Sequence, residues 1–412
     1  MKQFVIIGNS AAGIAAVEAI RKQDRDSKIT VVSDEEYSAY CRCLISYYLA
    51  GDIKEDKILY RPEAFYRNNN IELLLNKKVT RVDPKKNRVI LEDKTQLGFD
   101  ALLIATGAHP KFPEIKGIKK KGVFGFRTIK DTKDIEGLLP VTKAVCVLGG
   151  GLIGLKAAYA LRKRNIEVKV VIKSKQVLSQ MLDFEAANFV ERRLEEHGID
   201  IITGSDIEEV IGNGDIKAVK LDSGKAFGCS MIIVAKGVEA NTELIKETEI
   251  KVNEGIIANN LMQTNIPNIY TAGDVCENSP ALWPIAVEQG RIAGANMAGD
   301  NLNYQGSLGM NSIEFFGLPV VSLGVYKIKE GDSGFEELKI KDEKANSYKK
   351  LILKDNYLLG AVLVGDIKPS GILLRLIREK INILPFKDKL LQENLNYPDV
   401  MDFVKDKERL YV

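Results

Sequence analysis

Apolar runs that end in glycine-containing turns recur along this chain and divide it into comparable halves. The first run, Phe4–Ile7, leads into the loop Gly8–Gly13 and an alanine-rich segment. The second run, Val145–Leu148, leads into the loop Gly149–Gly154 and a segment of helical character. A short apolar run before a glycine turn is typical of a buried strand, so each segment predicts a strand, a tight turn and a helix.

Each half continues with the same order of predicted elements. Second strands are expected at Lys28–Val32 and Glu167–Ile172. Short alternating runs follow, from Ile71 to Ala101 in the first half, and they indicate hairpins or a meander. Closing strands with a glycine at their end are expected at Ala101–Gly107 and Met231–Val238. This long-range repeat predicts two domains of the same βαβ plan.

The rest of the chain has a different texture. Thr264–Val275 predicts a short strand that brings Gly273 and Asp274 to its carboxyl end, the edge where ligands lie in an open parallel sheet. From Leu308 onward, apolar runs such as Leu358–Val364 predict strands, and a helix is expected near residues 372–379. No glycine loop occurs there, so this part predicts a third, α+β unit.

The first glycine loop carries most of a dinucleotide-binding pattern. Gly8 permits the tight turn, and the helix start at Ala11, Ala12 and Gly13 directs unpaired N–H groups at a pyrophosphate. Ser10 stands at the middle position, where the pattern has glycine. An ordinary connection between a strand and a helix is the alternative interpretation.

The second glycine loop has the complete Gly-x-Gly-x-x-Gly pattern. Gly149, Gly151 and Gly154 fill the three glycine positions, with Leu152 and Ile153 before the last of them. Two such loops imply two dinucleotides in one chain.

Charged residues after the second strands bear on the ribose of each nucleotide. Asp34 or Glu35 follows the first of these strands and is the expected ribose partner, although a solvated acidic turn is the plain alternative. The second strand of the other half ends at Lys173-Ser174-Lys175, without a carboxylate. We therefore expect NADPH to be accepted alongside NADH, with Lys173 near its 2′-phosphate.

Composition excludes several function classes. The 412 residues are 45% hydrophobic, and the formal net charge is +3 with interspersed signs, so no nucleic-acid partner is expected. No apolar stretch approaches the ~20 residues of a membrane span and no signal sequence is recognised, so a cytoplasmic location without membrane contact is expected. Five cysteines fit a reducing compartment, and two histidines give no basis for a metal site or a Ser–His hydrolase.

Three motifs together resemble the pyridine nucleotide–disulfide oxidoreductase superfamily over essentially the full length of the chain. They are Tyr270–Asp274, the triplet Ala105, Thr106 and Gly107, and the Gly149–Gly154 loop. The resemblance implies that Asp274 holds the ribityl chain of FAD and that the second loop binds NAD(P)H. The internal repeat makes Gly237 the counterpart of Gly107, and it is expected to bind cofactor as well.

The resemblance also implies how the domains are arranged. The expected fold class is α/β, with two Rossmann-like dinucleotide-binding domains, one inserted in the other, and a C-terminal α+β domain. The FAD-binding domain would comprise residues 1–112 and 243–307, the NAD(P)-binding domain residues 113–242, and the C-terminal domain residues 308–412.

Two segments resemble different branches of the superfamily. Lys349–Lys354 and Leu359–Asp366 are similar to the C-terminal domains of rubredoxin reductases and of the flavin portion of nitrite reductases. Cys43–Gly51 is similar to the segment that holds the single redox cysteine of coenzyme A–disulfide reductases and NADH oxidases or peroxidases. Leu44 replaces a usual glycine in that segment and Ser46 a usual proline.

The expected function is transfer of electrons from NAD(P)H through FAD to a small protein of the iron–sulfur or rubredoxin type. One alternative is a disulfide, peroxide or oxygen reductase whose catalytic residue is Cys43, a thiolate with a pKa lowered by Arg42 beside the flavin. A dithiol centre with Cys41 is not expected, because a C-x-C disulfide closes a very small ring. Another alternative is a flavoprotein sensor or docking protein, and a homodimer is left open.

Overall fold

The computed structural model describes residues 1–392 and 395–400. The chain forms two compact units, each made of segments separated in sequence. The first unit comprises Met1–Phe112, Arg127–Glu136 and Lys236–Ser307, and the second comprises Pro113–Phe126, Gly137–Ala235 and the chain from Leu308 onward. The predicted fold class is confirmed, because two five-stranded parallel sheets, alike in the order of four of their strands, and a five-stranded antiparallel sheet in the C-terminal part are present. The domain boundaries given above stay a prediction.

A five-stranded parallel sheet forms the centre of the first unit. Its order is β18 (Ile269–Thr271), β7 (Ala101–Ile104), β1 (Gln3–Ile7), β2 (Lys28–Val32) and β3 (Ile71–Leu74). All four pairs are parallel, and residues 4–7 of β1 and all of β7 are apolar and buried because both faces are covered. The Ile71 run, predicted to begin a meander, instead supplies the edge strand of this sheet.

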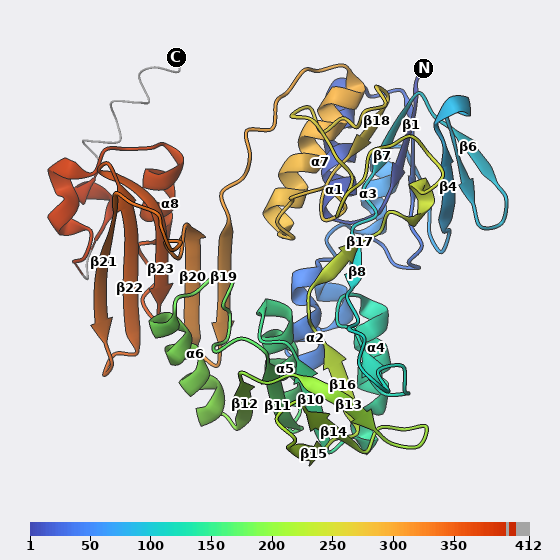
Figure 1. Ribbon diagram of the computed structural model, residues 1–412. Coiled ribbons are helices and arrows are strands. Elements are labelled where there is room, and N and C mark those ends of the chain that lie inside the picture. The colour runs from blue at the N-terminus through green and yellow to red at the C-terminus, as the bar shows by residue number, and fades with distance from the viewer. Residues whose placement is uncertain (393–394, 401–412) are drawn as a thin grey trace. The chain divides into compact units, whose positions relative to one another are not determined.

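Two long helices pack side by side on this sheet, α1 (Ala11–Gln23) and α7 (Trp283–Ala298), as Figure 1 shows. Their backbones approach closely at glycine. A Cβ on Gly290 would lie 2.1 Å from the Ala12 carbonyl oxygen, and one on Gly294 would lie 2.3 Å from that of Ala16. The approach brings the start of α1 next to the segment that follows β18.

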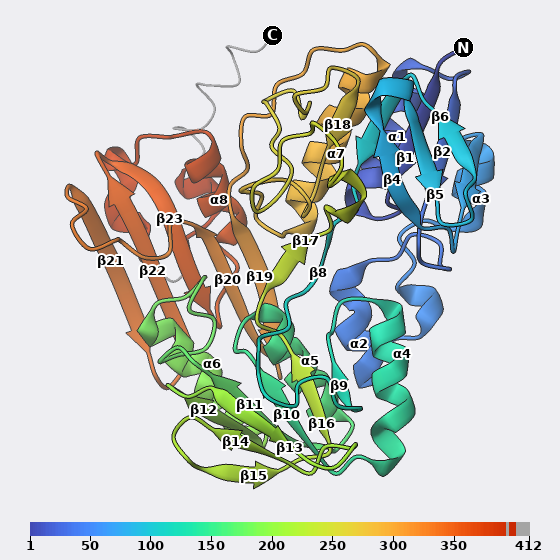
Figure 2. The ribbon, with the colours of Figure 1, turned by 45° about the vertical axis from the view of Figure 1, so that its right-hand side comes forward.

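Smaller elements complete the first unit. The antiparallel hairpin sheet contains β4 (Val79–Asp83), β5 (Arg88–Leu91) and β6 (Gln96–Gly98). The strands β8 (Ala108–Pro110) and β17 (Val238–Ala240) pair antiparallel where the chain leaves and re-enters this unit (Figure 2). The short helices are α2 (Ile45–Ala50), α3 (Glu63–Asn68) and most of α4 (Ile129–Leu138).

The second unit repeats the parallel sheet with a new set of strands. The order is β12 (Ile199–Thr203), β11 (Glu167–Ile172), β10 (Ala144–Leu148), β16 (Met231–Val234) and β9 (Val123–Phe124). The helices are α5 (Leu152–Lys163) and α6 (Phe184–Glu196), and a hairpin sheet contains β13 (Ile207–Ile211), β14 (Ala218–Leu221) and β15 (Ala226–Gly228). The predicted duplication of the βαβ plan is therefore present.

The C-terminal part of the second unit is an antiparallel sheet. Its order is β19 (Met310–Phe315), β20 (Leu318–Gly324), β23 (Tyr357–Val364), β22 (Ser347–Lys354) and β21 (Phe335–Asp342). Residues of one face, such as Leu351 and Leu363, pack with Leu376 of α8 (Ser370–Arg378). The opposite face meets α6, where the Tyr348 and Phe189 rings lie 6.3 Å apart.

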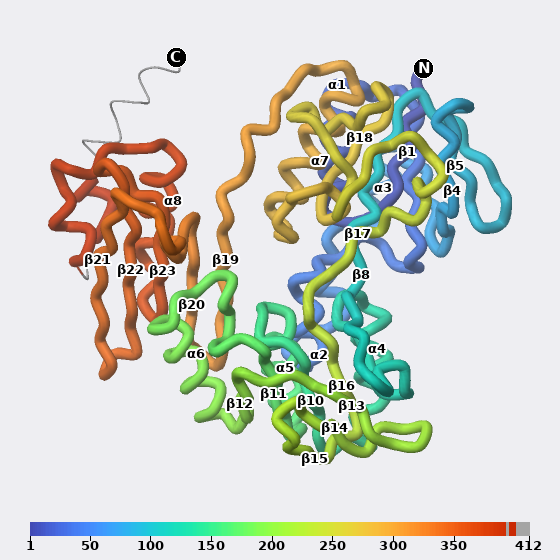
Figure 3. The backbone as a smooth tube through the Cα atoms, in the orientation of Figure 1, coloured from blue at the N-terminus to red at the C-terminus, as the bar shows by residue number. Residues whose placement is uncertain are grey.

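Connections contain several 3₁₀ turns and one extended stretch. Residues 300–309, between α7 and β19, contain no helix or strand (Figure 3). The 3₁₀ turns are η1 (Arg42–Leu44), η2 (Glu55–Lys57), η3 (Pro84–Lys86), η4 (Leu139–Val141), η5 (Glu243–Ile245), η6 (Leu384–Lys389) and η7 (Tyr397–Asp399).

Candidate flavin and coenzyme sites

The turn after β1 can be made only with glycine at its ends. Gly8 has φ of 120°, and a Cβ there would lie 2.1 Å from the Ala105 carbonyl oxygen. A Cβ on Gly13 would lie 2.0 Å from the Gly8 carbonyl oxygen. The two glycines therefore let α1 begin directly against the end of β7.

The start of α1 suits the pyrophosphate of a dinucleotide. Ser10 is the N-cap residue, with extended backbone and no side-chain capping hydrogen bond, and the first turn contains no acidic residue. The first N–H groups of a helix lack partners within it, and the positive end of the helix dipole lies there. These groups fit a bound phosphate, with the small Ser10 side chain at the position where the pattern has glycine.

The second loop repeats this geometry in the other unit. Gly149 has φ of 123°, and a Cβ on Gly154 would lie 2.0 Å from the Gly149 carbonyl oxygen. Gly151 is the N-cap residue of α5 without a capping side chain, and a Cβ there would meet no atom within 4 Å. Leu152 and Ile153 form the first turn of α5. A second phosphate therefore has space at this helix start.

The turn after β7 is tied to the segment that re-enters the first unit. The Thr106 hydroxyl donates to the Asn241 carbonyl at 2.8 Å, and the Asn241 side-chain amide donates back to the Thr106 carbonyl at 2.8 Å. The Asn241 N–H also donates to the Gly107 carbonyl at 3.0 Å. These bonds tie the Ala105–Gly107 turn to Asn241. The Ala105 N–H donates to the Ile7 carbonyl at 2.8 Å, which places the turn beside the Gly8 loop.

Gly273 and Asp274 reach the same place from β18. The Gly273 N–H donates to Oε1 of Gln289 at 2.8 Å, and a Cβ on Gly273 would lie 3.3 Å from that of Ala12. An Nη2 atom of Arg127 donates to Asp274 Oδ2 at 2.5 Å, and both side chains are more than four-fifths buried. The structure thus brings the Gly8 loop, the Ala105 turn and Asp274 together.

A second arginine connects this cluster to the end of β2. Arg42 pairs with Glu35, and its Nη1 atom donates to the Arg127 carbonyl at 3.0 Å. The Tyr40 hydroxyl donates to Glu35 at 2.5 Å. Asp34 is exposed, whereas Glu35 belongs to the cluster. Of the two expected ribose partners, Glu35 therefore lies closer to the other predicted flavin ligands.

Arg127 and Tyr40 are members of this cluster that sequence reasoning missed. Arg127 lies in a segment between β9 and α4 that carries no recognised motif. The Tyr40 hydroxyl also accepts from the Ile129 N–H at 3.2 Å, and burial raises the pKa of Tyr40. The nearest signal was the aromatic composition of residues 37–48, which is unusual for a loop.

Cys41 and Cys43 lie in the turn that carries Arg42. Cys43 is exposed and Cys41 partly exposed, whereas Cys146, Cys229 and Cys276 are buried. A hydrogen bond from Cys43 lowers the pKa of Cys41 to about 7, and the same bond, followed by burial and by the charges of Cys41 and Asp274, raises the pKa of Cys43. Burial raises the pKa values of the three other thiols.

The remaining predicted cofactor residues lie in different units. Lys173 is exposed in the second unit, directly after β11, and Lys175 is exposed beside it. Gly237 belongs to the first unit, with φ of 93°, and its carbonyl accepts from the Lys111 N–H at 3.0 Å.

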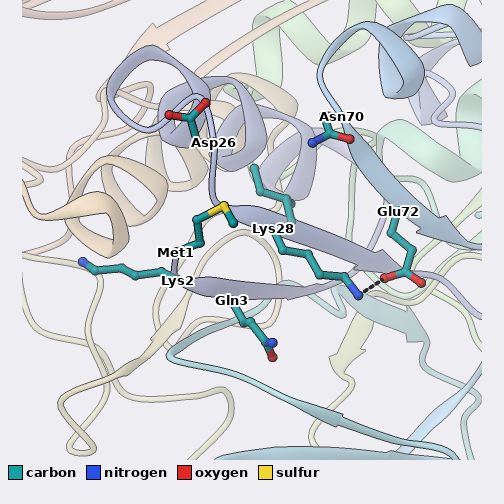
Figure 4. Close-up of a pocket in the computed structure, with 8 residues that line it drawn as sticks. Met1, Lys2, Gln3, Asp26, Lys28, Asn70 and Glu72 are labelled. Atoms are coloured by element: carbon teal, nitrogen blue, oxygen red, sulfur yellow. Dashed lines mark ion pairs between the residues drawn. The ribbon is translucent and has the colours of Figure 1, made fainter.

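Other features of the described residues add no further candidate site. They contain no cluster of three metal-ligating side chains, and none of their helices has the length and apolarity needed to cross a membrane. A surface hollow lies at the amino ends of β1 and β2, where Lys28 Nζ pairs with Glu72 at 2.9 Å (Figure 4). Ligands of open parallel sheets lie at the carboxyl edge, so this hollow is at the wrong edge for the dinucleotide.

Two known protein families match most of the chain. Residues 2–290 match the family model described as pyridine nucleotide-disulphide oxidoreductase, and residues 310–381 match the rubredoxin NAD⁺ reductase C-terminal domain. The chain is 32% identical over 387 residues to the NAD(P)H nitrite reductase of Bacillus subtilis (strain 168). The matched region covers 93% of this chain and 48% of that protein. It therefore spans about half the length of that relative.

Two further similarities concern proteins closer in length. The chain is 39% identical over 313 residues to the NADH oxidase of Methanocaldococcus jannaschii. The matched region covers 72% of this chain and 70% of that protein. The solved structure of an NAD-dependent persulfide reductase from A. fulgidus is 26% identical, has a TM-score of 0.86, and covers 99% of this chain and 83% of that one.

Proposed function

We propose that this chain passes electrons to a small redox protein of the rubredoxin or ferredoxin type. The chain belongs to the pyridine nucleotide-disulphide oxidoreductase family. Members of this family are NAD(P)H oxidoreductases that use FAD, and this chain is one of them. When bound, the flavin takes a hydride from reduced nicotinamide and can release the electrons singly or as a pair. The proposal therefore concerns the acceptor.

The observation that carries this proposal is the C-terminal domain. Residues 310–381, which include strands β19–β23, match a domain type named after rubredoxin reductase. The Cys43 segment supports the same choice, because Leu44 and Ser46 replace a glycine and a proline usual in the single-cysteine branch. Electrons would then leave the flavin without a thiol intermediate.

The chain's own residues would bind and orient the cofactors. The N-termini of α1 and α5 supply N–H groups and a positive dipole for the two pyrophosphates. Glu35 and Asp274 offer carboxylate oxygens to sugar and ribityl hydroxyls. Arg42 and Arg127 fix the position of these carboxylates through the ion pairs described above.

A single-cysteine reductase is the second candidate. Cys43 is exposed and lies near enough to Asp274 for that carboxylate to affect its thiol. A structural relative named as a persulfide reductase supports the same chemistry. The two candidates differ in whether electrons pass through sulfur after they leave the flavin.

Cofactor content and an acceptor panel test the proposal first. The purified protein should be yellow, with about one FAD per chain. Steady-state oxidation of NADH and NADPH should be measured with rubredoxin, ferredoxin, oxygen, peroxide and coenzyme A disulfide as acceptors. The proposal expects rubredoxin or ferredoxin to give the highest kcat/KM, and a colourless protein that takes up no FAD would contradict the family assignment itself.

The Cys43→Ser variant separates the two electron exits. If electrons leave directly from the flavin, reduction of an iron–sulfur or rubredoxin-type protein stays nearly unchanged. If Cys43 is the sulfur centre, flavin reduction by the coenzyme persists and the second half-reaction with disulfide or peroxide is lost. Stopped-flow measurement of both half-reactions decides, and loss of reoxidation by the redox protein would overturn the proposal.

A further inference from the structure

We propose that Glu191 is a positioning residue for the coenzyme, because its carboxylate holds the segment that receives the adenosine end of NAD(P)H. This segment, residues 173–178, directly follows β11 and carries Lys173 and Lys175; it is called the coenzyme segment below. In a Rossmann-like sheet the adenosine ribose lies at the end of this second strand. The inference rests on the coenzyme site proposed above at the Gly149–Gly154 loop.

Leu178, the last residue of the coenzyme segment, has a backbone conformation that side chains disfavour. Its φ is 49°, in the left-handed region, and its side chain is 2% exposed. A conformation of this kind costs free energy and persists only where surrounding contacts fix it. The shape of the coenzyme segment therefore depends on the bonds that its surroundings make with it.

Two consecutive N–H groups tie the end of the coenzyme segment to two different elements. The Leu178 N–H donates to the Gly150 carbonyl at 2.8 Å, in the middle of the glycine loop. The Val177 N–H donates to Oε1 of Glu191 on α6 at 2.8 Å. Because a trans peptide is planar, the Gly151 N–H points away from the Gly150 carbonyl and so away from Leu178. The same bond that holds Leu178 thus also orients the glycine loop.

Further hydrogen bonds brace the rest of the coenzyme segment. The Ser174 hydroxyl donates to the Gln176 carbonyl at 2.7 Å, and the Gln176 side-chain amide donates to the Leu182 carbonyl at 3.1 Å. The Gly204 N–H, directly after β12, donates to the Ser174 carbonyl at 3.0 Å. The two exposed lysines are therefore carried on a segment whose backbone is ordered before any coenzyme binds.

The bond from Val177 to Glu191 should matter for coenzyme binding. Without the Glu191 carboxylate, the Val177 N–H loses its partner and Leu178 can leave its disfavoured conformation. The segment would then lose conformational entropy each time coenzyme binds, which lowers affinity. The adenosine end takes no part in hydride transfer, so the loss affects ground state and transition state alike. KM for the coenzyme should rise and kcat should stay unchanged.

Equilibrium binding of oxidised coenzymes to the FAD-loaded protein tests the inference without turnover. Isothermal titration calorimetry with NAD⁺ and NADP⁺ compares the wild-type protein with Glu191→Ala and Glu191→Gln. We expect Glu191→Ala to raise Kd by about tenfold, which corresponds to about 1.4 kcal/mol. The Gln side chain keeps an acceptor oxygen, so Glu191→Gln should stay within about threefold of the wild-type Kd. Equal Kd values for Glu191→Ala and the wild-type protein would overturn the inference.

Glu195→Ala is the matched control. It removes an exposed carboxylate from the same helix and should leave both Kd values unchanged. An unaltered flavin content and spectrum shows that each variant is folded. If Glu195→Ala weakens coenzyme binding as much as Glu191→Ala does, the effect belongs to the charge of α6, and the role of the Val177 bond is refuted.

Hydrogen exchange measured by mass spectrometry locates the effect in the chain. Without coenzyme, Glu191→Ala should speed exchange in the peptide that contains Val177 and Leu178, and Glu191→Gln should not. Whichever oxidised coenzyme binds more tightly should slow exchange in this peptide of the wild-type protein. No such protection would contradict the proposed coenzyme site and this inference with it. Protection of the wild-type peptide with unchanged exchange in Glu191→Ala would refute the role of Glu191 alone.

Discussion

At the scale of single residues, the candidate flavin site combines two carboxylates with two arginines. Glu35 pairs with Arg42 and Asp274 with Arg127, and Arg42 also donates to the Arg127 carbonyl. The side chains of the Arg127–Asp274 pair are 17% and 19% exposed, so solvent screens their attraction only in part. The arginine holds each carboxylate in a fixed position. An ionised carboxylate has about four lone-pair sites, so some of them can still accept a hydrogen bond from a ligand hydroxyl.

Asp274 gives the sharpest prediction at this scale. Asp274→Ala should weaken FAD binding by about tenfold or more, because hydrogen bonds to charged groups are worth about 1.5–3 kcal/mol and a factor of ten in Kd corresponds to about 1.4 kcal/mol. Fluorescence titration of the apoprotein with FAD measures this. Glu247→Ala removes a carboxylate that is 73% exposed in the same unit and should leave Kd unchanged. Equal affinities of the two variants would contradict a role for Asp274.

Coenzyme choice also rests on single residues. Lys173→Glu should lower kcat/KM for NADPH by about tenfold or more and leave that for NADH nearly unchanged, because the carboxylate would repel a 2′-phosphate and can accept from a 2′-hydroxyl. Steady-state kinetics with both coenzymes measure the change. If the wild-type protein already prefers NADH a thousandfold, about 4 kcal/mol in transition-state terms, the lysines at the end of β11 do not face the ribose.

At the scale of elements, the contact of α1 with α7 depends on small residues. Gly290 lies against the Ala12 backbone and Gly294 against that of Ala16, so the two helices meet with their backbones nearly in contact. The approach holds the start of α1, whose N–H groups are proposed to bind a phosphate, against the segment after β18. Gly290 in α7 therefore helps to position the start of α1, although it is not itself a predicted ligand of the cofactor.

Gly290→Ala tests this helix contact. The added methyl would lie 2.1 Å from the Ala12 carbonyl oxygen, and overpacking of this kind typically costs about 1–3 kcal/mol of the free energy of unfolding. Gly137→Ala in α4 is the matched control. A Cβ there meets no atom within 4 Å, so it should be neutral or stabilise by about 0.5–1 kcal/mol. Denaturant unfolding of both variants measures the difference, and equal stabilities would mean that α7 moves away freely.

At the scale of the whole molecule, the chain crosses between its two units several times. The segment 127–136 lies near the start of the predicted coenzyme domain, yet it packs in the first unit and supplies Arg127. Within the second unit, the C-terminal sheet is joined to α6 by a buried ionic network. Lys350, 3% exposed, contacts Asp183 at 3.1 Å and Glu337 at 2.7 Å. The Tyr348 hydroxyl donates to Asp183 at 2.8 Å.

Lys350→Ala should therefore destabilise the second unit strongly. Removal of one partner from a buried ion pair typically costs about 3–5 kcal/mol. The lower end of this range is expected, because Asp183 keeps the hydrogen bond from Tyr348, and Glu337 is 28% exposed and also pairs with Lys339 at 3.0 Å. Lys341→Ala removes a lysine that is 39% exposed on β21 and should change stability by less than about 0.5 kcal/mol. Chemical denaturation followed by circular dichroism compares the variants. A loss similar to that of the control would show that Asp183 and Glu337 find other partners.

Much of this arrangement could be predicted because its signals are local. The strands β1 and β10, both glycine loops and the start of each following helix were read from contiguous residues. Residues 71–74 were misassigned to a meander, because a short apolar run reads alike in a hairpin and at the edge of a parallel sheet. Only the pairing of β3 with β2 distinguishes the two.

The sequence by itself determined the two glycine loops and the repeated βαβ plan, since a tight turn and a helix start depend on neighbouring positions, and it left Asp34 and Glu35 open as the predicted ribose partner. The tertiary structure alone decided that Arg127 meets Asp274, 147 positions away, and that Tyr40 and Arg42 meet Glu35 beside it. It also decided that Lys350 is buried between two carboxylates. The physical reason is that ion pairs and close helix contacts depend on distance in space, which hydrophobic periodicity and motif spacing do not encode.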